Sequence, residues 1–476
     1  MNKFKALAAN TAIFGISQFT SKILVFFLLP LYTSYMSEAD YGSSDLVFST
    51  VSLLLPICTL EISSAVMRFS MERRRESASF FRFGFMVILL GFAVLLACCP
   101  VFLIFHLFEG YLYLFYLLFL CNAFYQLLSY YSRGIQRVKL VGIVGVINTI
   151  VVIGLNILFL VGLRLGIIGY LLSYIGGYLI SDIVYLLMLH KNIFANAAVK
   201  KNQSERKDMI KYSVPLVPNN VSWWLVSSAN KYIISGYLSN AVLGLYSVAL
   251  KIPTIINTVQ GVFSEALVLS ILQEYNNKEK DEEYFSTLYR LYSTFSILVA
   301  SFVILFARIL SDLLFAKDFY QAWVYVPLLC ISPVWGALSG YLGNFYAATK
   351  KNNGMFFSTL LGGGITVLFS VLTVRFWGVY GIIAGNLISY FFIWLYRWLD
   401  TKKLVKLRIQ LGTDIAAWIL LIAQALIMTF LPSTFWAYCG NAVIIIILIM
   451  LKHQTIFPLI KKSVQLVKQK LGKQRN

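Results

Sequence analysis

The chain has 476 residues, of which 59% are hydrophobic and only 13% are charged, and its mean hydropathy is +0.76. Soluble globular domains carry about 25% charged residues, so this composition excludes a water-soluble globular protein. The formal charge of +20 would be typical of a nucleic-acid-binding protein. In an apolar chain, however, it must first be compared with the positive-inside rule of membrane proteins.

Apolar runs long enough to cross a bilayer recur along the chain, each needing about 20 residues. The first six are expected at 7–32, 44–67, 80–105, 111–132, 140–162 and 167–189. After a polar stretch they resume at 214–238, 241–271, 286–309, 321–347, 355–376, 380–398, 413–431 and 436–452. The sequence therefore predicts an all-α polytopic membrane protein with about 14 transmembrane helices.

The polar stretch divides these runs into two sets, which predicts two pseudo-symmetric six-helix bundles with two further helices at the C-terminus. The expected boundaries are 1–190 for the first bundle, 191–213 for a cytoplasmic linker, 214–400 for the second bundle, 401–454 for helices thirteen and fourteen, and 455–476 for a basic cytoplasmic tail.

Lys and Arg residues gather in alternate connections, for example at 73–75, 350–351 and 402–408. This bias predicts that both termini lie in the cytoplasm, and it explains the positive charge without nucleic acid as a partner. The connections are too short for a catalytic domain, so we expect no enzyme activity, and function must reside among the helices. The six cysteines lie in apolar runs without metal-ligand spacing, so we expect neither a metal site nor a cofactor.

Two short segments match each other, YMSEADYG at 35–42 and YLSNAVLG at 237–244. Each follows an expected helix that carries a lysine, Lys22 in the first and Lys231 in the seventh. Other small or polar residues lie on the same helical face as each lysine. These are Thr11, Gly15 and Gln18 before Lys22, and Asn220, Trp224 and Ser227 before Lys231. The match predicts repeats of the same orientation, related by an axis along the membrane normal.

Further charges lie inside expected helices, namely Lys251, Glu61, Asp182 and Glu265. A charge facing lipid costs about 3 kcal/mol on insertion scales, so these groups must face protein or water. They could pair with each other as internal salt bridges, or they could line a water-filled cavity. The lysines are expected nearer the outer face and the acids nearer the inner face, which favours a cavity that attracts an anion. A lysine on its flexible stem suits a phosphate-bearing ligand.

The stretches NTAIFGISQFTSKILVFFLLPLYTSYMSEADYG and ANKYIISGYLSNAVLGLYSVALKI resemble the polysaccharide-transporter branch of the multidrug/oligosaccharidyl-lipid/polysaccharide (MOP) exporter superfamily. Its best-known members are Wzx-type O-antigen flippases, which share a MATE-like fold. The resemblance implies transport of an undecaprenyl-pyrophosphate-linked oligosaccharide, such as an O-antigen repeat unit, from the cytoplasmic to the periplasmic leaflet by alternating access.

This resemblance also implies roles for particular residues. The pyrophosphate would lie against Lys22, Lys231 and Lys251, and coupling to H+ or Na+ would involve Glu61, Asp182 or Glu265. The cavity would be lined by polar or aromatic residues, listed here: Gln18, Asn220, Trp224, Ser227 and Asn230. Family members often carry an acid at the position of Asn230, which weighs against ion coupling there.

The expected location is the bacterial cytoplasmic (inner) membrane, with the polymerase and chain-length regulator of the same lipopolysaccharide pathway as candidate partners. Two alternatives stay open. A flippase of the peptidoglycan precursor lipid II would recognise the same pyrophosphate. A MATE-like drug/cation antiporter would be expected to place acids, not lysines, at the binding depth.

Overall fold

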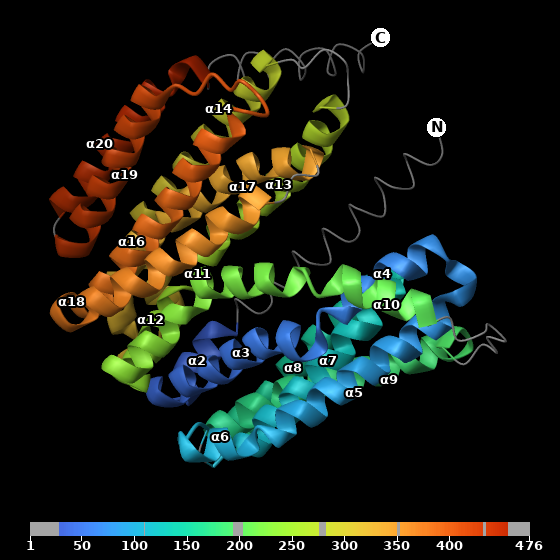
Figure 1. Cartoon of the computed structure of the whole chain (residues 1–476). Coiled ribbons are helices and arrows are strands. Elements are labelled where there is room, and N and C mark those ends of the chain that lie inside the picture. The colour runs from blue at the N-terminus through green and yellow to red at the C-terminus, as the bar shows by residue number, and fades with distance from the viewer. Residues whose placement is uncertain are drawn as a thin grey trace, which may run out of the picture. The chain divides into compact units, whose positions relative to one another are not determined.

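The computed structural model describes residues 28–108, 110–193, 203–275, 282–349, 353–431 and 435–455. The regular elements in these ranges are helices, without a strand, which confirms the predicted all-α class (Figure 1). Eight of the described helices are long and apolar enough to cross a membrane. Two bent helix pairs raise this number to ten if each pair counts as one span.

The first of two compact units comprises residues 1–245. Its helices are α2 (Leu29–Tyr35), α3 (Glu38–Thr59), α4 (Ile62–Glu72), η1 (Arg74–Glu76), α5 (Ser77–Ala97), α6 (Cys99–Ile104), α7 (Leu112–Gly134), α8 (Val138–Asn156), η2 (Ile157–Gly162), α9 (Gly166–Ile193), α10 (Gln203–Ser213) and α11 (Leu216–Tyr237). Helix α7 packs against α3, α4, α5, α8 and α9. Its Phe115, Phe119 and Tyr131 are fully buried, so the core of this unit follows α7.

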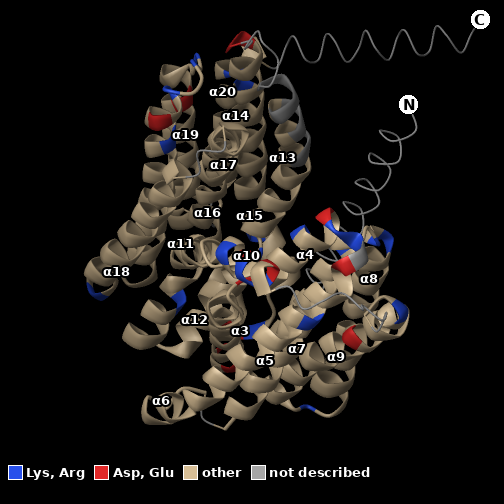
Figure 2. Ribbon diagram, turned by 45° about the vertical axis from the view of Figure 1, so that its right-hand side comes forward, with Lys and Arg blue, Asp and Glu red and all other residues tan. Residues whose placement is uncertain are grey.

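The outer surface of this unit is apolar, as expected for contact with lipid. The segment Ser77–Ile104 is the most hydrophobic of the candidate spans. Nevertheless, only 22% of its most apolar 18 residues are buried inside the protein. Leu90 and Val94 of α5 are 56% and 62% exposed. Along most of the helical length in Figure 2 neither acidic nor basic residues appear. Long exposed apolar surfaces of this kind mark a multi-pass membrane protein.

The polar stretch before α11 contains helix α10, which packs against α4. Met209 of α10 is fully buried in the core of the first unit, and the Arg73 guanidinium contacts the Glu205 carboxylate at 2.5 Å. The predicted linker at 191–213 thus includes a helix docked on the first unit. The division of the chain at 190 and 214 stays a prediction.

Several expected single helices are broken. The span predicted at 44–67 is divided into α3 and α4 at Leu60 and Glu61, which both have φ of 52°, a conformation that costs a non-glycine residue free energy. The span predicted at 241–271 consists of α12 (Asn240–Ala249) and α13 (Pro253–Tyr275). Proline has no N–H to continue a helix and is favoured in its first turn, so Pro253 begins α13 after a break that contains Lys251.

The second compact unit comprises residues 246–476. Besides the end of α12 and α13 it contains α14 (Glu282–Leu305), α15 (Ala307–Leu314), η3 (Lys317–Tyr325), α16 (Val326–Leu329), α17 (Ser332–Thr349), α18 (Asn353–Thr401), α19 (Leu411–Phe430) and α20 (Phe435–Leu451). Helix α18 covers the two spans predicted at 355–376 and 380–398. They meet at Gly378, whose φ of 54° is readily adopted by glycine.

A buried arginine joins α17 and α18 in this unit. Arg397 is 1% exposed and donates hydrogen bonds to the Ser339 carbonyl oxygen at 2.9 Å, to Ser358 Oγ at 2.9 Å and to Thr359 Oγ1 at 3.0 Å. Buried charged groups are stable only with such partners, so these contacts fix the register of the two helices.

A second buried charge joins α14, α19 and the residues after α20. The Lys452 amine contacts the Asp414 carboxylate, and both side chains are nearly inaccessible. Ser293 Oγ of α14 donates a hydrogen bond to the same carboxylate at 3.0 Å. The ion pair therefore fixes α19 and the end of α20 on α14.

Replacing Lys452 by Ala should leave the Asp414 carboxylate buried without its cation, which costs about 3 to 5 kcal/mol in comparable sites. We expect a clearly lower melting temperature of the detergent-solubilised protein, measured by fluorescence-detected gel filtration after heating. The double variant Lys452→Met, Asp414→Leu should regain most of the loss, because both charges are gone.

The matched control is Lys403→Ala. The Lys403 side chain is 79% exposed although it contacts Asp400 at 3.2 Å. An exposed pair contributes at most about 1 kcal/mol, so this variant should melt close to the native protein. Equal melting temperatures for Lys403→Ala and Lys452→Ala would contradict a stabilising role of the buried pair.

Candidate functional site

The two matching sequence segments form equivalent turns. Helices α2 and α11 end at the equivalent residues Tyr35 and Tyr237, and α3 and α12 then begin with an N-cap serine. Ser37 Oγ accepts a hydrogen bond from the Asp40 N–H at 3.1 Å, and Ser239 Oγ accepts one from the Val242 N–H at 3.2 Å. Serine at this position satisfies an N–H that the first turn leaves unpaired. The local equivalence predicted from the sequence match is confirmed.

These two turns also pack against each other through the glycine that ends each matching segment. A Cβ atom on Gly42 would overlap the backbone oxygen of Asn240, and one on Gly244 would overlap the backbone oxygen of Glu38. Glu38 and Asn240 are equivalent positions of the match, so the contact is reciprocal, as across a local two-fold axis. Only glycine permits this approach of two backbones at both positions.

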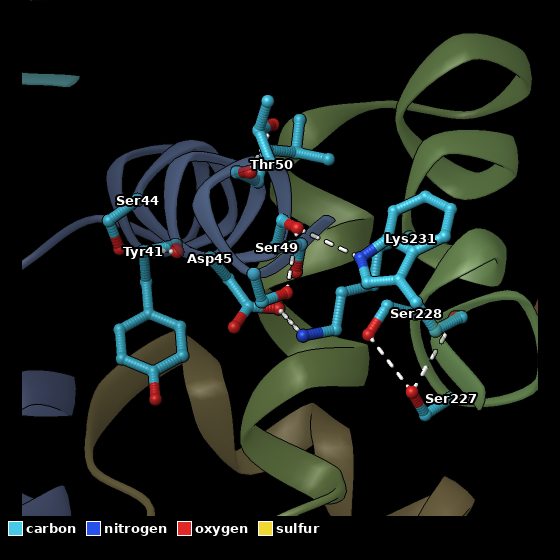
Figure 3. A network of polar contacts seen from close by, with 11 residues as sticks. Tyr41, Ser44, Asp45, Ser49, Thr50, Ser227, Ser228 and Lys231 are labelled. Atoms are coloured by element: carbon cyan, nitrogen blue, oxygen red, sulfur yellow. Dashed lines mark hydrogen bonds and ion pairs between the residues drawn. The ribbon is translucent and has the colours of Figure 1, made fainter. Parts of the chain in front are cut away.

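Close to these turns, α3 and α11 hold an ion pair. The Lys231 amine of α11 lies 2.8 Å from the Asp45 carboxylate of α3, and each side chain is 15% exposed. Figure 3 shows the two groups pointing toward each other from their helices. Lys231 lies six residues before the end of α11 and Asp45 seven residues after the start of α3, so both lie about 10 Å from the turns.

Neutral hydrogen bonds flank this pair. The Trp224 indole N–H donates to the Ser49 carbonyl oxygen at 2.9 Å, and the Tyr232 hydroxyl contacts the Thr50 hydroxyl. The rings of Trp224 and Tyr232 are 5.5 Å apart. Both aromatic residues near Lys231 therefore serve the α3–α11 contact in this structure.

The other predicted residues of α11 lie in different environments. Asn230 is 1% exposed, and Asn220 is half-buried. Ser227 is exposed and lies beside Ser228, with the two hydroxyl oxygens 3.3 Å apart (Figure 3). Because residues three and four apart share a helix face, Ser227 and Ser228 lie one turn from Lys231.

The predicted acids Glu61 and Asp182 are both in the first unit and buried, each with 8% exposure. Glu61 lies in the break between α3 and α4 and accepts a hydrogen bond from Ser64 Oγ at 2.9 Å. Asp182 lies in α9, and its Oδ1 is without a hydrogen-bond partner among the described residues.

The neighbours of Asp182 are weakly polar. Its carboxyl lies within electrostatic reach of a thiol and three tyrosine hydroxyls, those of Cys121, Tyr125, Tyr178 and Tyr185. An unpaired carboxylate oxygen in such surroundings is unstable unless a proton or a cation neutralises it. The ion-coupling role predicted for Asp182 stays a prediction.

For the remaining predicted site residues, the place relative to Lys231 stays a prediction. Gln18 and Lys22 lie outside the described residues. Lys251 lies in the break between α12 and α13 in the second unit, half-buried. Glu265 belongs to α13, and its side chain lies outside the described set. Whether the three lysines act together stays a prediction.

Asp45, the partner of Lys231, was not predicted from the sequence. It lies at the beginning of the span expected at 44–67, where a charge is common at a membrane surface. The matching turns held the missing signal. Helices α3 and α11 meet at reciprocal turns, so residues that are equally far from those turns lie side by side. This geometry brings Asp45 next to Lys231.

Comparison with a family model places residues 7–269 in the family described as "Polysaccharide biosynthesis protein", which is more than half of the chain. No curated protein sequence matches the chain.

Solved structures share the fold. A lipid II flippase, MurJ, in an inward closed conformation matches with a TM-score of 0.68 at 15% identity, over 94% of this chain and 99% of that one. An inward-facing multidrug resistance transporter of the MATE family and the MOP superfamily matches with a TM-score of 0.65 at 14% identity, over 81% and 95%. A MOP superfamily transporter from Pyrococcus furiosus, described as having a binding pocket of reverse polarity, matches with a TM-score of 0.54 at 14% identity, over 83% and 96%.

The glycine contact predicts that Gly42→Ala and Gly244→Ala each lower the melting temperature, since an added methyl must push two backbones apart. Overpacking of this kind typically costs about 1 to 3 kcal/mol. The control is Gly236→Ala in α11, where an added Cβ meets no atom within 4 Å. Alanine is also the better helix former there, so this variant should be unchanged or more stable. Three equal melting curves would contradict the close approach.

Proposed function

Because the chain belongs to the family of polysaccharide biosynthesis proteins, we propose that it is a flippase for a lipid-linked oligosaccharide. Its substrate is an undecaprenyl-pyrophosphate-linked glycan, an O-antigen or other surface polysaccharide repeat unit, moved from the cytoplasmic to the outer leaflet by alternating access. In this proposal the protein has a Wzx-like role in lipopolysaccharide or related synthesis, alongside the polymerase and chain-length regulator. It acts as a transporter and not as an enzyme.

The proposal includes the arrangement inferred from the sequence. It has fourteen transmembrane helices in two six-helix bundles, with two further helices, in a bacterial inner membrane with both termini in the cytoplasm. The likeness to the MurJ and MATE structures supports this arrangement. The turns at Gly42 and Gly244 then lie at the outer face, and the substrate approaches Lys231 from the cytoplasmic side.

The ion pair of Lys231 is the observation that carries the proposal. Lys231 is a cation within a helix of a membrane protein, held by the Asp45 carboxylate at 2.8 Å and still 15% exposed. The exposed hydroxyl of Ser227 and the neighbouring hydroxyl of Ser228 lie one turn away. A pyrophosphate placed there would meet an ammonium group and two hydroxyl groups, of which Ser227 Oγ would turn away from the Trp223 carbonyl oxygen that it now donates to at 3.0 Å.

A lipid II flippase is the second candidate, since its substrate carries the same pyrophosphate. The likeness to the MurJ structure extends over 94% of the chain, whereas the likeness to the MATE structure extends over 81%. A basic residue at the site also favours an anionic substrate over the cations of a drug antiporter. Both observations support a pyrophosphate-bearing lipid. The class of glycan separates the two candidates.

Transport in this proposal is coupled to H+ or Na+ through Asp182, with Glu61 and Glu265 as further candidates. Asp182 carries the argument because its Oδ1 is buried without a hydrogen-bond partner among the described residues. It is 8% exposed and surrounded by tyrosines, so the charge of the carboxylate requires a proton or a cation.

Lys231→Ala should lower export of the surface glycan about 10- to 100-fold. The alanine variant loses both the hydrogen bond from the ammonium to the pyrophosphate and the attraction between their charges. A hydrogen bond to a charged group contributes about 1.5 to 3 kcal/mol. Lys231→Arg should retain part of the activity. Export is measured as surface polysaccharide in a strain that lacks the native gene, with Lys403→Ala as control. Normal export by Lys231→Ala, at equal protein abundance, would contradict the assignment.

The same deletion strain separates the two substrates. We expect loss of one surface polysaccharide and accumulation of its lipid-linked repeat unit in the cytoplasmic leaflet, while peptidoglycan synthesis continues. Accumulation of lipid II and lysis would instead support the lipid II candidate.

Asp182→Asn should remove the dependence of transport on an imposed proton or sodium gradient. The asparagine amide has nearly the shape of the aspartic acid side chain, but it neither takes up a proton near neutral pH nor carries a charge. Transport is measured in vesicles with gradients of H+ or Na+ imposed in turn. Ser181→Ala is the neighbouring control, since Ser181 Oγ donates within α9 to the Gly177 carbonyl oxygen at 2.7 Å. An unchanged gradient dependence in Asp182→Asn would remove Asp182 from coupling.

A further inference from the structure

Contacts between α3 and α11 run in one line from the turns along the two helices, and we call this line the α3–α11 seam. In order from the turns, it contains Gly42 with Asn240, Ser43 with Asn240, Asp45 with Lys231, and Ser49 with Trp224. The Asn240 Nδ2 donates to Ser43 Oγ at 3.1 Å. The seam closes the end of the two helices at which the turns meet.

The ion pair differs from the other contacts of the seam in what can replace it. The backbone approach at Gly42 and the bond from Trp224 to Ser49 join neutral groups. The contact between Lys231 and Asp45 joins opposite charges at 2.8 Å. An anionic ligand can take the place of the Asp45 carboxylate on the ammonium, and it cannot take the place of the neutral contacts.

We propose that Asp45 is the resting counter-ion of Lys231, and that an anion which displaces it from Lys231 releases the α3–α11 seam. This inference rests on the proposed function, in which the anion is the pyrophosphate of the lipid-linked glycan. Asp45 is then a positioning residue: it holds Lys231 ready and keeps the seam closed while the site is empty.

The physical reason is the charge that displacement leaves behind. Once Lys231 binds a phosphate oxygen, the Asp45 carboxylate has lost its contact with the ammonium and lies beside a further negative charge. Both effects raise the free energy of the closed seam. Separation of α3 from α11 admits water to Asp45 and lowers its free energy again. The ligand thus favours the open state because it interacts differently with the two states.

Before displacement, the same charges favour closure. Each side chain of the pair is 15% exposed, so a ligand can reach the ammonium without prior unfolding of either helix. The exposed Ser227 lies one turn along α11, away from the turns, which places the incoming anion on the side from which the seam is to be opened. Binding and release of the seam therefore concern one group, the Lys231 ammonium.

Closure is measured by cross-linking a pair of cysteines, Ser43→Cys with Asn240→Cys, in the full-length protein in lipid nanodiscs. The native side chains touch at 3.1 Å, so oxidation should join them rapidly in the empty protein. Undecaprenyl pyrophosphate in the nanodisc should slow the reaction at least fivefold, and inorganic pyrophosphate in solution should do so at higher concentration. Neutral undecaprenol is the lipid control.

In the same cysteine background, Asp45→Asn should cross-link slowly without any ligand and should respond little to pyrophosphate. Asp45→Glu should restore rapid cross-linking and the response. The matched control is Ser332→Cys with Asn386→Cys between α17 and α18, whose native side chains touch at 3.0 Å. This pair should cross-link at one rate in all conditions.

Native cross-linking and a native ligand response in Asp45→Asn would overturn the inference while leaving the proposed function intact. A second outcome would instead contradict the pyrophosphate site of the proposed function. If neither pyrophosphate slows cross-linking although Asp45→Asn does, the ion pair closes the seam but pyrophosphate is not exchanged there, and displacement by substrate is refuted.

Discussion

A largely buried lysine in a helix of a membrane protein must have its charge compensated, and in this protein the compensation comes from a neighbouring helix. Lys231 of α11 and Asp45 of α3 meet at 2.8 Å in a setting where each charge alone would be costly. The ion pair fixes the relative position of the two helices. In that position the side chains of Trp224 and Tyr232 form hydrogen bonds between uncharged groups of α11 and α3. This arrangement also leaves the Lys231 side chain 15% exposed beside the Asp45 carboxylate.

The turns next to this pair explain why it can form. Equivalent serines cap α3 and α12, and Gly42 and Gly244 allow the two backbones to approach reciprocally. The contact brings an element that follows the linker, α11, into the first compact unit beside α3. Alternating access, the mode of transport proposed above, needs such a contact to be firm in one state and absent in another. An ion pair with exchangeable partners, between close-packed glycines and neutral bonds, meets both needs.

The sequence was sufficient for the features that depend on hydrophobic runs and on local signals. The helical class, the equivalence of the two matching segments and the family followed from them. The breaks were harder to predict, because Leu60 and Glu61 adopt positive φ without a glycine to indicate it. The partner of Lys231 was missed because pairing depends on tertiary geometry. Asp45 lies far from Lys231 in sequence and near an expected span boundary, where acids are ordinary. Asp182 was recognised as a charge within a helix, but its unpaired oxygen required the structure.

The most direct measurement is transport by the purified protein in proteoliposomes. A fluorescent oligosaccharide on undecaprenyl pyrophosphate is placed in both leaflets, and an added membrane-impermeable glycosidase reports which molecules reach the outer leaflet. We predict that the protein moves the pyrophosphate-linked glycan rapidly from the inner to the outer leaflet, so that the glycosidase cleaves all of it. The same glycan on a neutral polyprenyl ether should stay in the inner leaflet and escape cleavage. Equal rates for both lipids, or no rate above that of protein-free liposomes under any ion gradient, would contradict this prediction.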